Sequence, residues 1–158
     1  MENFLVSHFS SKTNNKLING ILYQLNNLDE VENNIIKIVK NLEQEMNRKL
    51  NITIDATFII KVLIYIYNSY IIVLDFPHML DKVNRKKRPC LHIVIGETIS
   101  QLVSIALLSE SINFINNNTL ISNNIKVKLF KEVYNHGMNF SSEIYLLESK
   151  SLKMNNCL

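Results

Sequence analysis

The residues whose types and spacing could do chemistry lie in one segment, from Asp75 to Glu97. Asp75 follows directly on a long apolar run, and the basic cluster Arg85 to Arg88 begins ten residues later. Carboxylates are ligands that Mg²⁺ prefers, and arginine and lysine bind phosphate groups. The spacing indicates either a site for a phosphorylated ligand and its metal ion, or a polar helix end followed by a solvated basic loop. A single carboxylate makes a poor Mg²⁺ site, which favours the second interpretation.

Two histidines and one cysteine in the same segment have side chains of the types that bind zinc. His78, Cys90 and His92 match no familiar spacing of zinc ligands. Cys90 also lacks the neighbouring pattern of histidine and acid that makes a thiol a nucleophile. Gly96, shortly after them, is expected to permit close packing of helices. The sequence therefore favours neither a zinc site nor a cysteine nucleophile.

The elements that must position these residues are predicted to be helices. Only three glycines and two prolines occur in 158 residues, which favours long helices over a turn-rich sheet. Residues 12–26 have the pattern of a short amphipathic helix and residues 29–49 that of a stronger one. The stripe of the second helix recurs at helical spacing, through Val31, Ile35, Val39, Leu42 and Met46.

Residues 55–75 form a nearly continuous apolar run, which has two interpretations. A membrane span needs about 20 apolar residues, close to the length of this run. Polar and charged side chains inside a membrane are costly, and the run contains Lys61, Asn68 and Ser69. These residues favour the central helix of a bundle, apolar on most sides. The tyrosines of the run are then packing residues, namely Tyr65, Tyr67 and Tyr70.

The remainder is predicted as a loop followed by three helices. Residues 76–91 carry both prolines and are expected to form a loop with at most one helical turn. Helices are predicted over 92–115, over 121–135 with a stop at Gly137, and over 140–152. The chain is thus expected to be one all-α domain of five to seven helices.

The composition of the chain bears on two questions, whether it binds nucleic acid and in which cellular compartment it is found. The net charge of +3 is too small to indicate a nucleic-acid partner. Two cysteines suggest no disulfide scaffold, and the N-terminal residues lack the pattern of a signal peptide. We therefore expect the interior of a cell, cytoplasmic, organellar or within a host cell, and no secretion. The abundance of Asn, Ile, Lys and Tyr suggests an AT-rich genome.

Four pieces of the sequence together resemble a known family. The segment LDFPHML, residues 74–80, falls where the isoprenyl diphosphate synthases have their first aspartate motif, DDLPxMD. RKKRP, residues 85–89, falls on RRGKP, and HIVIGE, residues 92–97, falls on HKVFGE. Ala106-Leu107-Leu108 then falls on an A-L-L segment, with no gap from Leu74 onward. The resemblance covers roughly residues 55–146 and implies a helical bundle like the N-terminal half of the isoprenoid synthase fold.

The family's working residues are mostly changed in this chain. In the family, motif aspartates hold Mg²⁺ against the departing diphosphate. Here Leu74 and Leu80 stand at the first and last aspartate, so only Asp75 remains as a vestigial metal ligand. The arginine pair that contacts diphosphate corresponds to Arg85 and Lys86, and lysine lacks the planar fork of arginine. The family's second aspartate-rich motif has no counterpart.

The resemblance therefore implies ancestry rather than activity. We expect a degenerate, truncated isoprenyl-synthase-like protein without prenyltransferase activity, retained as a helical protein-binding module. A homodimer or a helical protein partner is expected, and no cofactor, with Mg²⁺ only if activity remains. Two alternatives stay open. One is a regulatory or weakly active subunit of a prenyl transferase. The other is a small membrane-associated protein that uses residues 58–74 as its anchor.

Overall fold

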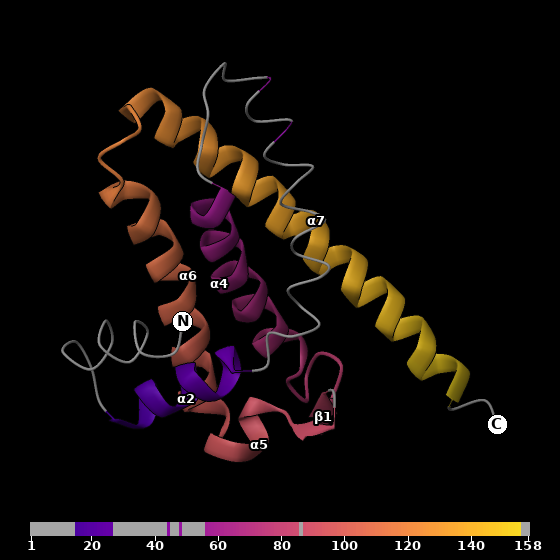
Figure 1. The fold of residues 1–158 in the computed structure, drawn as a ribbon. Helices are drawn as coiled ribbons and strands as arrows, with labels where there is room; N and C mark the ends of the chain where they lie inside the picture. The colour runs from indigo at the N-terminus through magenta and orange to yellow at the C-terminus, as the bar shows by residue number, and fades with distance from the viewer. Residues whose placement is uncertain (1–14, 27–43, 45–47, 49–55, 86, 156–158) are drawn as a thin grey trace.

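The computed structural model describes residues 15–26, 44, 48, 56–85 and 87–155, and this part of the chain is all-α, as predicted (Figure 1). The helices are α2 (Asn15–Leu25), α4 (Ala56–Leu74), α5 (Leu91–Ile95), α6 (Glu97–Asn117) and α7 (Asn123–Asn155). A two-residue antiparallel pair, β1 (Asn84–Arg85) and β2 (Arg88–Pro89), interrupts them. The helix predicted over 29–49 lies outside the described residues, except for positions 44 and 48.

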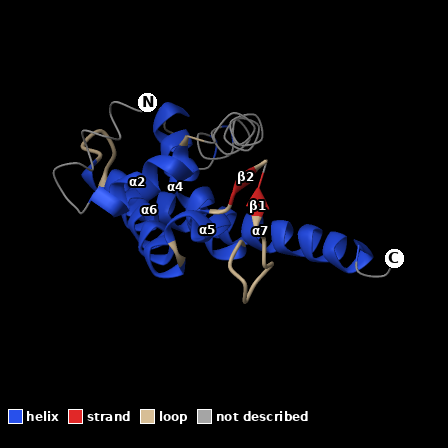
Figure 2. Cartoon of the chain, turned by 90° about the horizontal axis from the view of Figure 1, so that it is seen from below, coloured by secondary structure: helices blue, strands red, loops and turns tan. Residues whose placement is uncertain are grey.

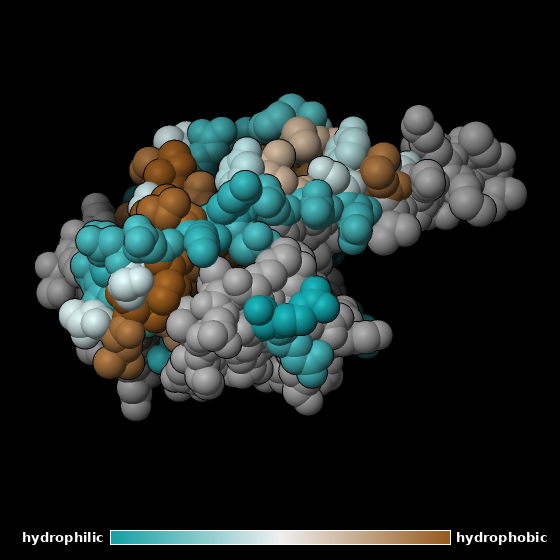
Figure 3. Space-filling model, turned by 90° about the horizontal axis from the view of Figure 1, so that it is seen from above, coloured by the Kyte–Doolittle hydropathy of each residue, from teal (hydrophilic) through white to brown (hydrophobic). Residues whose placement is uncertain are grey.

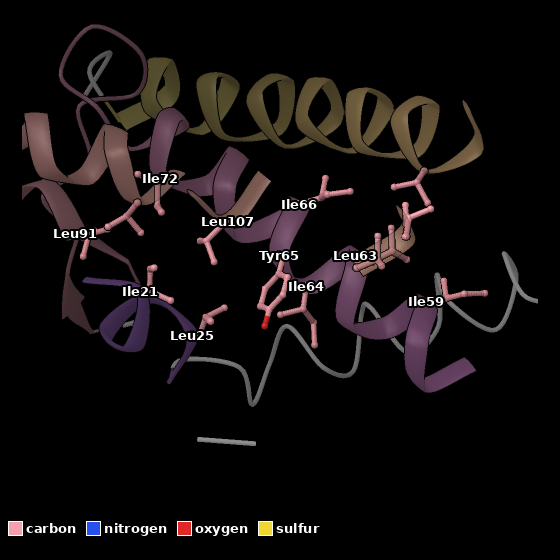
Figure 4. Close-up of a cluster of buried hydrophobic side chains, with 14 of the residues drawn as sticks. Ile21, Leu25, Ile59, Leu63, Ile64, Tyr65, Ile66, Ile72, Leu91 and Leu107 are labelled. Atoms are coloured by element: carbon pink, nitrogen blue, oxygen red, sulfur yellow. The ribbon is translucent and has the colours of Figure 1, made fainter. Parts of the chain in front are cut away.

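Helix α4 is the centre of the bundle, as its sequence predicted. Helix α4 packs against α6 and α7. Helix α2 lies across α6 and contacts it (Figure 1). Figure 4 shows Leu25 of α2 and Leu107 of α6 gathered with Tyr65 of α4 in one apolar cluster. Because α4 is covered on several sides, its side chains are apolar nearly all round.

The polar residues of α4 are hydrogen-bonded inside the bundle. Asn68 donates to the Ile64 carbonyl at 2.9 Å and accepts from Gln24 Nε2 at 3.0 Å. Ser104 of α6 donates to the Ser69 carbonyl at 3.0 Å, and the two hydroxyls lie 3.0 Å apart. Buried polar groups stabilise a fold only when they are paired, and small serines let two helices approach closely. These contacts favour the bundle interpretation of residues 55–75.

One helix in the described part of the chain passes a test for membrane spanning by length and composition. This helix is α6, and α4 contributes a shorter apolar stretch, Phe58–Leu74. That shorter stretch is the anchor that the membrane alternative requires. A buried core helix has the same length and apolar composition, so these two properties do not distinguish a core helix from a membrane span.

Gly137 does not stop a helix, contrary to the prediction. Helix α7 runs without a break through both of the helices expected over 121–135 and 140–152. Gly137 is buried against α4, where an added Cβ would lie 3.0 Å from Ile66 Cγ2 and 3.1 Å from Tyr70 Cε2. The glycine therefore permits close packing of α7 on α4, and tertiary contact overrides its low helix propensity.

The segment between α4 and α6 also differs from the prediction. The expected loop over 76–91 contains the β1–β2 hairpin, and the helix expected over 92–115 is divided at Gly96. Gly96 has φ 84° and nothing within 4 Å of an added Cβ. Its role is therefore a left-handed backbone between α5 and α6, rather than the close packing that was expected.

Candidate functional site

Asp75 and Arg85, two of the three site residues chosen from the sequence, contact each other. Asp75 lies one residue beyond α4 and is buried. Arg85, on β1, donates from Nε to both carboxylate oxygens, at 2.9 and 3.1 Å, and from Nη2 to Oδ1 at 2.6 Å. The side chains are 6% and 16% exposed, respectively. This fork-shaped pairing is among the strongest that proteins form, and it neutralises a carboxylate in a poorly hydrated place.

Cys90 completes the surroundings of the Asp75 carboxylate. Its buried thiol lies beside the Asp75 carboxylate. Burial, followed by the negative charge of Asp75, raises the pKa of the Cys90 thiol from 9.0 to about 12, although Arg85 and Lys82 act in the opposite direction. A thiol with so high a pKa stays protonated at neutral pH and is a poor nucleophile.

The chain after Asp75 folds back over the end of α4. Leu80 donates its backbone N–H to the Leu74 carbonyl at 3.1 Å, and Lys82 donates to the Asp75 carbonyl at 3.2 Å. The Leu80 side chain thereby packs on Ile71 and Leu74, with Tyr67 at the edge of this small cluster. Leu74 and Leu80, at the two lost aspartate positions of the resemblance, thus form an apolar plug.

The basic hairpin is held by a residue that the sequence analysis did not single out. Tyr23 of α2 donates its hydroxyl to the Pro89 carbonyl at 2.8 Å. Arg88 lies over the Tyr23 ring, 4.1 Å from its centroid, and donates to the Tyr23 carbonyl at 3.3 Å. Arg85 and Arg88 are therefore both engaged within the fold. Lys86 lies outside the described residues, between the strands that Figure 2 shows in red.

The two histidines of the segment flank Phe76. His78 stacks on the Phe76 ring at 5.5 Å between centroids, and His92 meets it edge-on at 5.7 Å. His92 is buried, and its Nδ1 has no hydrogen-bond partner. Within the described ranges, no group of three His, Cys, Asp or Glu side chains is arranged to hold a metal ion. The histidines therefore contribute packing around Phe76.

A cavity of about 410 Å³ lies at the opposite end of α4. Its lining includes Phe58, near the start of α4, and Glu110, Asn113 and Phe114 of α6. Phe58 and Asp75 are 17 positions apart, which is about 25 Å along a helix. Figure 3 shows hydrophobic surface at this end of the molecule, where α6 passes into α7. Neither Asp75 nor Arg85, the described site residues chosen from the sequence, is among the residues that line this cavity.

Glu110 gives the cavity a polar side. Asn113 Nδ2 donates to Glu110 Oε1 at 3.1 Å, and the ring of Phe114 packs at 5.6 Å from that of Tyr65. Burial, and then the charge of Glu110, raises the pKa of Tyr65. The Tyr65 hydroxyl therefore stays protonated and belongs to the core.

Fold and site together define an all-α protein whose best candidate site is closed by its own side chains. A scan of protein-family models found no match to the chain, and a search of curated proteins found none either.

Proposed function

We propose that this protein is a helical protein-binding module of isoprenyl-synthase-like ancestry, without prenyltransferase activity. The observation that carries the proposal is the state of Asp75. Its carboxylate accepts hydrogen bonds from Arg85 Nε and Nη2, and Leu74 and Leu80 fill the two lost-aspartate positions with apolar side chains. A diphosphate site would need carboxylates open to Mg²⁺ and an arginine open to phosphate.

Two backbone angles favour the ancestry in the proposal. Lys87 has φ 64° and Gly96 has φ 84°. Lys87 stands where the motif RRGKP has glycine, and Gly96 is the glycine of HKVFGE. Left-handed angles suit glycine and are uncommon for other residues. A lysine in this conformation is what a retained hairpin with a substituted glycine would give.

A binding role is supported by uncovered apolar surface. Large apolar side chains are exposed along α6 and at intervals along α7. Contiguous apolar surface on a monomer commonly marks an interaction site. Such a surface requires no metal or diphosphate site, so it fits a fold whose chemistry has been lost.

The direct test is an assay of prenyl transfer. The full chain is incubated with labelled isopentenyl diphosphate, allylic diphosphates of several lengths, and Mg²⁺. We expect no product above that of a heat-treated control. Product that accumulates at enzymatic rates, and that Asp75→Ala abolishes, would refute the proposal and favour a weakly active subunit.

A further inference from the structure

The cavity where α6 passes into α7 combines a buried carboxylate with apolar walls. Glu110 is 9% exposed and Leu120 is 91% exposed, so the cavity runs from a mouth at Leu120 to a carboxylate at depth. Phe58 of α4 and Phe114 of α6 line it with aromatic rings. Its 410 Å³ lies within the range of roughly 300–1,000 Å³ that is usual for pockets that hold small organic ligands. The shape and lining fit a ligand with a polar head and a hydrocarbon body.

Three polar side chains that line the cavity form a chain of hydrogen bonds along one face of α6. Asn117 Nδ2 donates to Asn113 Oδ1 at 2.7 Å, and Asn113 Nδ2 donates to Glu110 Oε1 at 3.1 Å. Successive bonds in one direction polarise each other and hold the carboxylate in place. Because both amides donate toward Glu110, the acceptor end of the chain is the Asn117 amide oxygen. Asn117 is exposed, so this acceptor lies toward the mouth.

The charge around the cavity is negative. Helix α6 ends here, and its C-terminus contributes about half a negative elementary charge. Helix α4 begins nearby at Ala56, and its N-terminus contributes about half a positive charge, so the two dipoles roughly cancel. The full charge of Glu110 then decides the sign. Among the described residues that line the cavity, none is lysine, arginine or histidine. The site therefore favours a cationic head group.

The end of α6 already accepts an ammonium group from its own chain. Lys126 Nζ of α7 donates to the Asn116 carbonyl, in the last turn of α6, at 2.5 Å. Lys126 is not among the residues that line the cavity, so this contact lies outside it. The wall at the mouth is also held in place, because Asn118 Oδ1 accepts the Leu120 backbone N–H at 2.9 Å. Such a preformed site loses little conformational entropy when a ligand binds.

We propose that this cavity binds a primary ammonium group carried on a hydrocarbon chain. The ammonium lies toward Glu110 and the Asn117 amide oxygen, and the hydrocarbon packs on Phe58 and Phe114, whose ring faces also attract a cation. Two ligands share this chemistry, a free alkylamine and the side chain of a lysine on another polypeptide. The inference does not rest on the proposed function, because the cavity and Asp75 lie at opposite ends of α4.

The test is a titration of the ¹⁵N-labelled full chain, followed by nuclear magnetic resonance. The probe is n-hexylammonium at neutral pH and constant ionic strength, with hexanol and hexanoate as uncharged and anionic controls of the same length. We expect saturable shifts of the Asn113 and Asn117 side-chain amides with a Kd on the order of 1 mM. Hexanol is expected to bind at least about tenfold more weakly, and hexanoate is expected not to saturate.

Two matched variants test the role of the buried charge. Glu110→Gln keeps an oxygen to accept the Asn113 hydrogen bond and removes the charge, so it is expected to raise Kd at least about tenfold. Glu97→Gln removes the other acid of α6, which is exposed at the first position of the helix, and is expected to leave Kd within about twofold. Circular dichroism confirms that each variant is folded.

A change at the mouth serves if Glu110→Gln does not fold. Asn117→Lys places an ammonium at an exposed position of the lining and is expected to abolish binding, whereas Asn117→Asp is expected to lower Kd about threefold.

The peptides Gly-Lys-Gly and Gly-norleucine-Gly, capped at both ends, differ by the ammonium group and distinguish the two sources. A lysine peptide that binds more tightly than hexylammonium indicates a lysine of a polypeptide, and the reverse order indicates a free amine. No saturation with either ammonium compound would overturn the inference. Hexanol binding equal to that of hexylammonium, or a Kd that neither Glu110→Gln nor Asn117→Lys changes, would overturn it as well.

Discussion

The Asp75–Arg85 pair predicts how the protein responds to loss of one charge. Asp75→Ala removes the carboxylate that receives Nε and Nη2 of Arg85 and leaves the guanidinium without it. Removing one partner of a fully buried pair costs about 3–5 kcal/mol. The Arg85 side chain keeps 16% exposure, so water recovers part of this loss. We therefore expect Asp75→Ala to lower the free energy of unfolding by about 2–3 kcal/mol.

The matched control replaces both partners. Asp75→Leu together with Arg85→Met removes the pair and fills its volume with apolar groups, and it is expected to cost about 1 kcal/mol or less. Urea unfolding followed by circular dichroism measures each variant, and an unchanged m-value confirms that the comparison is valid. If the double variant lost as much stability as the single variants Asp75→Leu and Arg85→Met together, the two residues would not be coupled, and the reasoning would be wrong.

Magnesium gives a second readout of the same pair. Because the carboxylate already accepts hydrogen bonds from Arg85 Nε and Nη2, millimolar Mg²⁺ is expected to leave the urea midpoint of the wild type unchanged. A midpoint that rises with Mg²⁺, and does so only while Asp75 is present, would identify a metal ligand after all.

Three further perturbations follow from the geometry. The raised pKa of Cys90 means that its contribution to stability is present below pH 9 and is lost as pH rises toward 12. Asp75→Asn should lower the pKa of Cys90, so that iodoacetamide labels Cys90 at lower pH. Cys157, the second cysteine of the chain, is replaced by serine so that Cys90 alone is labelled. Gly20→Ala puts a Cβ 2.8 Å from Val103 Cγ2 and should cost about 1–2 kcal/mol, which Val103→Ala partly recovers in a double-mutant cycle. Lys87→Gly relieves the left-handed lysine and should raise the free energy of unfolding, measured in urea, by about 0.5 kcal/mol, with Lys87→Ala as the control.

Local pattern was sufficient for the helices that begin and end on strong signals. The predicted helices over 12–26 and 55–75 correspond to α2 and α4, because amphipathic spacing and a long apolar run set their limits. Gly137 misled the prediction because a glycine inside a packed helix has the same sequence signature as a glycine after its end. Only the contact with Ile66 and Tyr70 distinguishes the two.

The sequence predicted which residues belong to the candidate site, but it did not predict the ion pair between Asp75 and Arg85. Asp75 and Arg85 were both singled out from their types, as vestigial ligands of a metal and a diphosphate. Their contact depends on the hairpin, which reverses the chain at Lys87 without glycine. Tyr23, which positions that hairpin, lies 66 residues before Pro89 in the sequence. Local sequence patterns do not predict a contact between residues so far apart. The sequence therefore identified Asp75 and Arg85 as charged candidates, but it did not predict that they pair with each other.

The continuity of α7 has a mechanical consequence. Its 33 residues make a rod of about 50 Å, and Figures 1 and 2 show its C-terminal half extending beyond the other described elements. Past Gly137, most of the side chains whose burial the structure describes are exposed, Tyr145 and Leu146 among them. These side chains add little burial, so the helix there gains from them little beyond intrinsic helix propensity. Amide hydrogen exchange should accordingly quicken from Gly137 toward the end of α7, within one uninterrupted helix. The bundle would then outlast the unwinding of this arm.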